Sequence, residues 1–193
     1  MQIVDANFES EKFLTVCSKK NVHVYSLQPI QSIDSISGGP FVFAAFAKQY
    51  LFAVSDTNTP PYILSFLLIY KNGSFSRSIE FNSNILQIRS TESYVFVSLE
   101  STIHVLEIET FNLISTIERP NKSGLITASE KYIAYINDDN LGYVTIASVP
   151  GFSIIQNIQC HKDPITTLSI SEDGNLLITS STVGTLIRTF GIG

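Results

Sequence analysis

The sequence contains no tryptophan, a single methionine and two cysteines, Cys17 and Cys160. Two cysteines are too few for the disulfide framework that stabilises many small secreted domains, so we expect both to be free thiols. The longest apolar stretches, 41–47 and 62–70, fall well short of the ~20 residues that a membrane-spanning helix needs. The composition therefore predicts neither a disulfide-rich domain nor a helix that spans a bilayer.

Positive charge is also scarce, because 12 Lys and Arg stand against 17 Asp and Glu, which gives a formal net charge of −5. Affinity for a nucleic-acid backbone comes largely from clustered Lys and Arg, so no nucleic-acid partner is predicted. A local pocket can still hold one anionic headgroup, whatever the net charge of the molecule. The N-terminal residues, which include Asp5 and Glu9, lack the basic region and apolar core of a secretory signal, so we expect a cytoplasmic location.

The sequence does contain a repeated pattern of strand-forming residues, since Val, Ile, Phe, Tyr, Ser and Thr dominate its composition. Comparable apolar segments, VHVY, LLIY, IHVL, VTIA and IRTF, begin at Val22, Leu67, Ile103, Val144 and Ile187. Their spacings are 45, 36, 41 and 43 residues. Such periods, each with several short strands, are typical of a propeller of four-stranded blades. A β-sandwich also has short, regularly spaced strands, but it does not need this period.

We therefore predict an all-β protein: one β-propeller portion over residues 1–193, with four antiparallel blades of four strands and three strands of a fifth. The expected blades cover residues 2–37, 41–81, 85–118, 123–159 and 164–193, the last one incomplete. In the first blade we expect strands near residues 3–8, 13–17, 22–25 and 31–36. A portion of this size cannot close on itself by the route that a full ring uses, which leaves two sheet faces and an unpaired strand edge exposed. Either the sequence is cut short, or self-association or a second chain completes the ring.

Residues 161–190, HKDPITTLSISEDGNLLITSSTVGTLIRTF, form the most informative segment. Ile165, Leu168 and Ile170 are spaced for one buried strand over 165–170, and the Asp-Gly of SEDGN suits a tight hairpin. A second strand follows over 176–181, and a Val-Gly-Thr turn leads into a third over 186–190. The segment therefore predicts three strands of an antiparallel meander.

This order of features resembles the PROPPIN family: a His, an apolar strand, an Asp-Gly turn, a small-residue strand ending in Ser, then Gly-Thr-Leu-Ile-Arg and an aromatic residue. Residues 79–129 are similar to the second to fourth blades of that family. The blades lack the Gly-His and Trp-Asp signatures of the common WD repeat, which is also family-like. PROPPINs are seven-bladed β-propellers that bind phosphoinositides. The resemblance implies a non-enzymatic effector of autophagy and endolysosomal membrane traffic that recognises phosphatidylinositol 3-phosphate or 3,5-bisphosphate, lies peripherally on endosomal, vacuolar or autophagic membranes and recruits autophagy-type protein partners.

The resemblance also implies that His161, Ser181, Thr185 and Arg188 contact the phosphoinositide headgroup. Imidazole and hydroxyl groups bond phosphate oxygens, and a guanidinium adds charge and a bidentate fork. The Arg-Arg-Gly strand on which the family's lipid binding rests is not in this sequence, and Thr182-Val183 replace residues that are commonly polar or charged. We therefore expect lipid binding by this chain to be weak or absent.

Each of these four residues also has a plain structural interpretation. His161 suits a turn at a blade entry, Ser181 and Thr185 are ordinary hairpin hydroxyls, and Arg188 is a solvated or ion-paired side chain of a strand. No cofactor is predicted. His23 and His104 occupy equivalent strand positions with no further ligand at zinc-like spacing, so no metal is expected either.

Catalytic motifs such as a Gly-Lys-Ser phosphate loop or a Gly-x-Ser-x-Gly elbow are absent from the sequence, which favours a non-enzyme. Two other functions remain open. The first is a propeller that recruits proteins without reading lipid. The second is a propeller enzyme whose catalytic side chains converge on a central channel.

Overall fold

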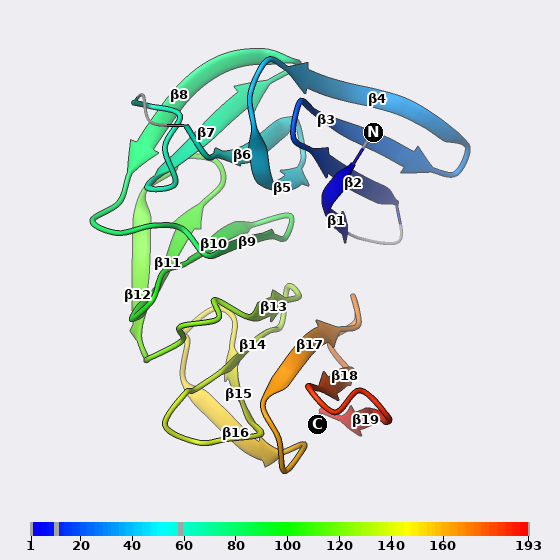
Figure 1. The fold of residues 1–193 in the computed structure, drawn as a ribbon, viewed down its shortest axis with the longest axis vertical. Helices are drawn as coiled ribbons and strands as arrows, with labels where there is room; N and C mark the ends of the chain where they lie inside the picture. The colour runs from blue at the N-terminus through cyan, green and yellow to red at the C-terminus, as the bar shows by residue number, and fades with distance from the viewer. Residues whose placement is uncertain (1, 10–11, 58–59, 193) are drawn as a thin grey trace. The chain divides into compact units, whose positions relative to one another are not determined.

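The computed structural model describes residues 2–9, 12–57 and 60–192, and every regular element in these residues is a β-strand (Figure 1). The strands form four sheets of four strands and a fifth sheet of three, within the same described ranges. Neighbours in each sheet are consecutive in sequence, and the pairings are antiparallel. The predicted all-β fold, a β-propeller portion with a three-stranded fifth blade, is confirmed. Its extent as one domain stays a prediction.

The chain divides into two compact units, Met1–Glu92 and Ser93–Gly193. The first unit contains two complete sheets and one more strand. Its strands are β1 (Ile3–Phe8), β2 (Phe13–Ser18), β3 (Asn21–Leu27) and β4 (Ile30–Ser37), then β5 (Phe41–Ala47), β6 (Tyr50–Ser55), β7 (Phe66–Lys71) and β8 (Ser74–Glu80), and finally β9 (Gln87–Ser90).

The second unit contains the remaining ten strands. They are β10 (Tyr94–Ser98), β11 (Thr102–Glu107) and β12 (Leu113–Glu118), then β13 (Ile126–Ala128), β14 (Tyr132–Ile136), β15 (Tyr143–Ser148) and β16 (Ile154–Gln159), and finally β17 (Ile165–Ile170), β18 (Leu176–Ser181) and β19 (Ile187–Gly191). The third strand of the fifth sheet begins one residue later than the sequence predicts. No helix among the described residues is long and apolar enough to cross a membrane.

A register shift recurs at one position in each four-stranded sheet. It lies between the third and fourth strands, at Val24/Tyr25, Ile69/Tyr70, Val105/Leu106 and Ile146/Ala147. Each pair is the third and fourth residue of a repeated apolar segment: VHVY, LLIY, IHVL or VTIA. Because a bulge bends its strand and increases the local twist, the shared position gives the blades a shared shape. The sequence repeat is therefore a structural repeat at single-residue precision.

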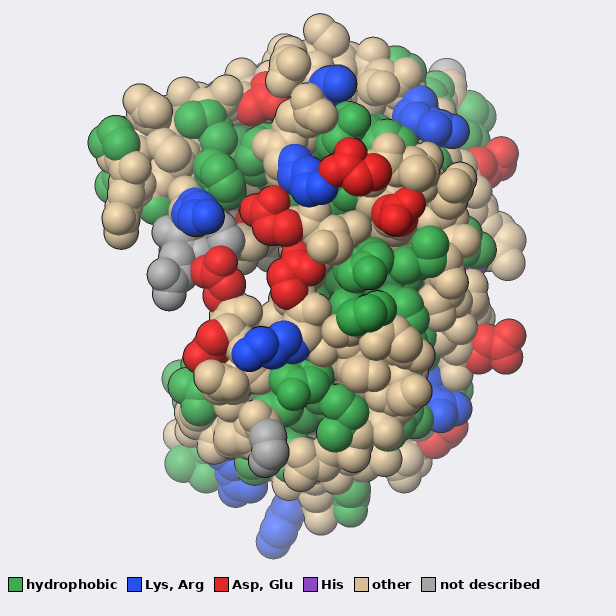
Figure 2. Space-filling view, turned by 180° about the vertical axis from the view of Figure 1, so that it is seen from behind, with side chains coloured by type: hydrophobic (Ala, Val, Ile, Leu, Met, Phe, Trp, Pro, Cys, Tyr) green, Lys and Arg blue, Asp and Glu red, His purple; other side chains and the backbone are tan. Residues whose placement is uncertain are grey.

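Burial differs between the inner and outer strands of a blade. All six residues of β6 are buried, whereas the outermost strands β4, β8, β12 and β16 are mostly exposed. Each outer strand shows an exposed hydrophobic side chain at its first or second residue: Ile30, Phe75, Leu113 or Ile154. Figure 2 shows hydrophobic side chains at several places on one face of the molecule. The apolar core therefore lies at the inner and middle strands.

Each unit has its own core between successive sheets. In the first unit, Val22 and Val24 of β3 pack with Phe46 of β5 and Leu51 of β6, and the rings of Phe13 and Phe46 meet edge to face at 5.3 Å. In the second unit, one cluster joins β14 and β15 to the fifth sheet through residues such as Ile146 and Leu168. Within each unit, apolar packing thus holds neighbouring sheets together.

Candidate functional site

The predicted site residues all belong to the fifth sheet or to the connection from β16 to β17 that leads into it, which we call the blade entry. His161 lies in the connection from β16 to β17, Ser181 ends β18, Thr185 lies in the following turn and Arg188 lies on β19. The glycine-containing turn begins with a hydrogen bond from the Gly184 amide to the Ser181 carbonyl, 2.9 Å long. All four residues are therefore positioned by one hairpin and one blade connection.

His161 is buried, with 5% of its surface exposed, and its ring is engaged inside the protein. The Nε2 atom lies 2.9 Å from Oγ1 of Thr179, a fully buried residue of β18. Buried polar groups are hydrogen-bonded because an unpaired one costs free energy, so this contact fixes the ring. The structure therefore favours the interpretation of His161 as a residue of the blade entry, and its Nε2 is not available to a ligand.

Gly142, before β15, holds the backbone at this entry. Its carbonyl oxygen accepts hydrogen bonds from the amides of Cys160, at 2.9 Å, and His161, at 3.1 Å. Its φ is +75°, which is in the left-handed region, and a Cβ at this position would overlap the carbonyl oxygen of His161. Only glycine allows this close approach without strain. Gly142 thus links the fourth sheet to the entry of the fifth.

Arg188, on β19, also contacts the blade entry. It lies directly across from Thr179 in the pairing of β18 with β19, and its Nη1 donates a 2.7 Å hydrogen bond to the carbonyl oxygen of Cys160. The residue is otherwise exposed. A guanidinium has five N–H donors, so one internal bond leaves donors for an anion. Arg188 is therefore held in place and is more than a freely solvated side chain.

Cys160 supplies that carbonyl and a buried thiol. Burial raises the pKa of the Cys160 thiol to about 11, while a hydrogen bond with Thr179 and the charge of Arg188 act in the opposite direction. The thiol is a free one, like that of Cys17. Because the thiolate is the reactive form, a thiol with such a pKa is inert near neutral pH.

Ser181 and Thr185 differ in exposure. Ser181 follows Thr179 by two residues on β18, so both side chains point to the same face, which is also the face of Arg188. Ser181 is 8% exposed, whereas Thr185 is exposed in the turn. The structure thus brings His161, Ser181 and Arg188 to one face of the fifth sheet and places Thr185 at its end. Thr179 and Gly142 were missed by the sequence reasoning, although the alternation Thr179-Ser180-Ser181 indicates a shared face.

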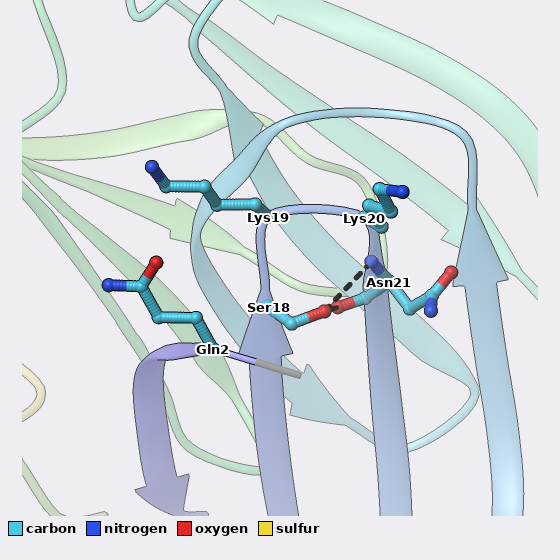
Figure 3. Close-up of a pocket in the computed structure, with 5 residues that line it drawn as sticks. All are labelled: Gln2, Ser18, Lys19, Lys20 and Asn21. Atoms are coloured by element: carbon cyan, nitrogen blue, oxygen red, sulfur yellow. Dashed lines mark hydrogen bonds between the residues drawn. The ribbon is translucent and has the colours of Figure 1, made fainter.

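Two cavities bear on anion binding. One of about 170 Å³ adjoins the entry and is lined by residues that include Asp138, Gly142 and Pro164. Its size is below the ~300 Å³ of usual ligand pockets, and its carboxylate disfavours an anion. A cavity of about 450 Å³ lies at the β2–β3 hairpin of the first unit, where Lys19 and Lys20 extend from the tip (Figure 3). There the Ser18 hydroxyl donates a hydrogen bond to the Asn21 carbonyl oxygen and accepts one from the Asn21 amide, so the backbone of the hairpin already occupies it.

Among the residues that the structure describes, no group of three or more His, Cys, Asp or Glu side chains is arranged to hold an ion. What the fifth sheet does offer is an exposed guanidinium, fixed at one end, beside two hydroxyl-bearing residues. Such a set of donors suits a phosphate-bearing ligand.

Comparison with known proteins yields a family match over nearly the whole chain: the PROPPIN profile matches residues 6–193. Autophagy-related protein 18 of Dictyostelium discoideum is 33% identical over 118 residues, which cover 59% of this chain and 32% of the relative. Human WD repeat domain phosphoinositide-interacting protein 1 is 24% identical over 189 residues, which cover 93% of this chain and 42% of the relative. The chain thus spans less than half the length of these curated relatives.

Solved structures with the same fold include Kluyveromyces lactis Hsv2, with a TM-score of 0.77 and 19% identity, over 98% of this chain and 60% of that one. KlAtg21, solved in complex with the coiled-coil of AgAtg16, has a TM-score of 0.79 and 19% identity, over 99% of this chain and 66% of that one. At these identities, the likeness establishes the fold.

Proposed function

Because this chain belongs to the PROPPIN family, we propose that it is the part of a phosphoinositide-binding effector that carries one side of a headgroup site. The protein would act without catalysis in autophagy and endolysosomal membrane traffic, on endosomal, vacuolar or autophagic membranes. The names of the human and Dictyostelium relatives, which refer to phosphoinositide interaction and to autophagy, support this proposal.

The observation that carries the proposal is the anchored guanidinium of Arg188. One end of it bonds the Cys160 carbonyl at 2.7 Å, which restricts the side chain. A restricted Arg loses less conformational entropy on binding than a free one, and its planar fork matches the geometry of a phosphate. We assign the charge contact to Arg188 and the flanking hydroxyl contacts to Thr185 and Ser181.

His161 has a different role in this proposal from that of the other three residues. Since its Nε2 faces Thr179, a direct contact with a headgroup falls to its Nδ1. Its main contribution is to hold the Cys160–His161 backbone, and through the Cys160 carbonyl it positions Arg188. His161 therefore belongs to the site as a positioning residue.

Affinity is expected to be weak, because the fifth blade of this chain supplies a single guanidinium to the site. Charged hydrogen bonds at a solvated surface each contribute modestly, and membrane binding becomes strong when several weak sites act together. We expect this chain alone to be captured weakly or not at all by vesicles.

Vesicle flotation tests the proposal. Phosphatidylcholine vesicles with and without phosphatidylinositol 3-phosphate are mixed with the wild-type chain, with Arg188→Gln, and with Arg77→Gln as a control for the loss of one exposed positive charge on β8. Any capture that depends on the headgroup should disappear in R188Q and persist in R77Q. Strong headgroup-specific capture would contradict the weak-binding expectation, and equal residual capture of R188Q and wild type would contradict the site.

A protein-interaction scaffold that does not read lipid is the second candidate function. The exposed side chains of Leu113 and Ile114 on β12, and of Ile154 and Ile155 on β16, favour it. KlAtg21, which shares the fold, was solved with a coiled-coil partner. Exposed apolar side chains on successive outer strands suit such a partner. Under this alternative, protein capture would depend on these residues and would be unaffected by R188Q.

A further inference from the structure

A group of polar and charged side chains, most of them half-buried, lies within the first unit. Asp5 of β1, Glu9 just after β1, and Arg89 and Ser90 of β9 belong to it. The Nδ2 atom of Asn7 donates hydrogen bonds to Oδ2 of Asp5, at 2.8 Å, and to the carbonyl oxygen of Ala44 on β5, at 3.2 Å. The group therefore joins β1 and β9 to β5.

Ser90 stands between two acceptors. Its Oγ lies 3.1 Å from Oε2 of Glu9 and 3.1 Å from the carbonyl oxygen of Phe46. A hydroxyl has one hydrogen to donate, and a carbonyl oxygen can only accept. The contacts of Ser90 with Glu9 and with Phe46 are therefore both full hydrogen bonds only if one of the two partners is protonated and donates to the Ser90 oxygen. That partner is Glu9, whose protonated carboxyl would donate to Ser90 while Ser90 donates to Phe46.

The charges of the group lead to the same conclusion. Arg89 is the positive group that acts on both Asp5 and Glu9, and all three residues are half-buried, so two ionised carboxylates would leave one partly buried negative charge uncompensated. A buried unpaired charge is avoided by taking up a proton. Oε1 of Glu9 and the hydroxyl of Thr15 are both enclosed, and neither has a hydrogen-bond partner within the described residues.

We propose that Glu9 keeps a proton in the folded chain at neutral pH, and that loss of this proton loosens the contact of β1 and β9 with β5, so that the first unit responds to pH. The proton-bearing contact is the one between Glu9 and Ser90. The device lies outside the fifth-blade site and does not depend on the proposed function.

The electrostatics of the surrounding groups agree with this proposal. Burial raises the pKa of Glu9 to about 8, against the smaller effects of Arg89, Ser90, Thr15 and the Phe46 backbone. Burial also raises the pKa of Asp5, whereas it lowers that of Arg89. Cys17 of β2 faces Asp5, and burial raises its pKa to about 12, so this thiol stays protonated in the range of interest.

The sign of the stability change follows from the raised pKa of Glu9. A carboxyl whose pKa is higher in the folded than in the unfolded state stabilises the fold fully below the unfolded pKa, and this contribution is lost as pH rises to the folded pKa. Between pH 6 and pH 9 the folding equilibrium constant should therefore fall, by up to ~100-fold for a shift of this size.

The experiment measures urea unfolding midpoints by circular dichroism at pH 6, 7, 8 and 9 for the whole chain. The wild-type midpoint should fall from pH 6 to pH 8 and level off above the folded pKa, and Glu9→Gln, whose amide can donate to Ser90 as the protonated acid does, should remove most of that fall. Glu80→Gln, at an exposed position on β8, should follow the wild type. Parallel pH profiles of E9Q and wild type would overturn the proposal. It would also be overturned if Asp5→Asn abolished the pH dependence of the midpoint while E9Q kept the wild-type dependence.

A direct titration keeps the proposal testable if E9Q does not fold. The carboxyl 13C shift of Glu9 in the wild-type chain should titrate above pH 7. A midpoint near 4.5 would overturn the proposal.

Discussion

The Nε2 atom of His161 and the Oγ1 atom of Thr179 lie 2.9 Å apart and are both buried, which ties the entry of the fifth blade to its middle strand. Through the backbone of Cys160, the same entry holds Arg188. A residue that the family resemblance assigns to lipid thus acts first on the protein itself. The geometry of the candidate site depends on this contact.

Removal of the Thr179 hydroxyl should destabilise the chain. In Thr179→Val the buried Nε2 of His161 loses its partner, which costs about 1–3 kcal/mol. The measurement is the urea midpoint by circular dichroism. Thr189→Val is the matched control, because Thr189 is exposed on β19 and should change the stability by less than about 0.5 kcal/mol. Equal effects of the two substitutions would contradict the role given to the contact.

Alanine at Gly142 should be more harmful than alanine at another glycine. The left-handed backbone alone costs about 1–3 kcal/mol for a residue with a Cβ, and the overlap with the His161 carbonyl adds to that cost. At Gly191 the space for a Cβ is open, so Gly191→Ala should be close to neutral. Thermal or urea unfolding of both variants makes the comparison. A fully stable G142A would show that the entry tolerates displacement.

Both thiols should react slowly in the folded chain. With the pKa of Cys160 raised to about 11, its thiolate fraction at pH 8 is roughly a hundredfold below that of an ordinary cysteine, and the pKa of Cys17 is higher still. Labelling with a thiol reagent at pH 8, followed by mass spectrometry, should be slow without urea and fast with it. In G142A, the Cys160 label should appear earlier than the Cys17 label. Rapid labelling of native wild-type chain would contradict the buried positions.

Self-association is expected from the fifth sheet. The outer edge of β19 pairs with no strand in the described part of the chain, and Ile187 is 77% exposed there. Unpaired edges with apolar side chains attract a second strand. Light scattering should show a mass that rises with concentration, and Ile187→Lys should reduce it. Ile30→Lys, at an equally exposed position on β4, should not. A concentration-independent monomer would contradict the expectation.

The strands of this fold could be predicted well from the sequence because each blade repeats one local pattern. The predicted strand over 165–170 matches β17, and that over 176–181 matches β18. Alternating apolar residues and Asp-Gly turns are local signals, so they can be seen in a single sequence. The recurrent bulge in VHVY and its counterparts has no such signal, because it depends on the partner strand.

The site could be predicted only in part. The resemblance names His161 and Arg188. The sequence does not reveal that the His161 ring is hydrogen-bonded to Thr179, or that Arg188 donates a hydrogen bond to the Cys160 carbonyl. These contacts join segments 18 and 28 residues apart and depend on how the fourth sheet meets the fifth. The contact of Glu9 with Ser90 could not be predicted either, because it joins residues 81 positions apart in the sequence.

The most direct test of the central claim is a titration of the 15N-labelled chain with the soluble headgroup inositol 1,3-bisphosphate, followed by NMR. The account predicts weak, saturable shifts of the amides of Ser181, Thr185 and Arg188, and of the Arg188 side chain, that are absent with inositol and lost in R188Q. Shifts located elsewhere, or shifts in the fifth blade that survive R188Q, would contradict it.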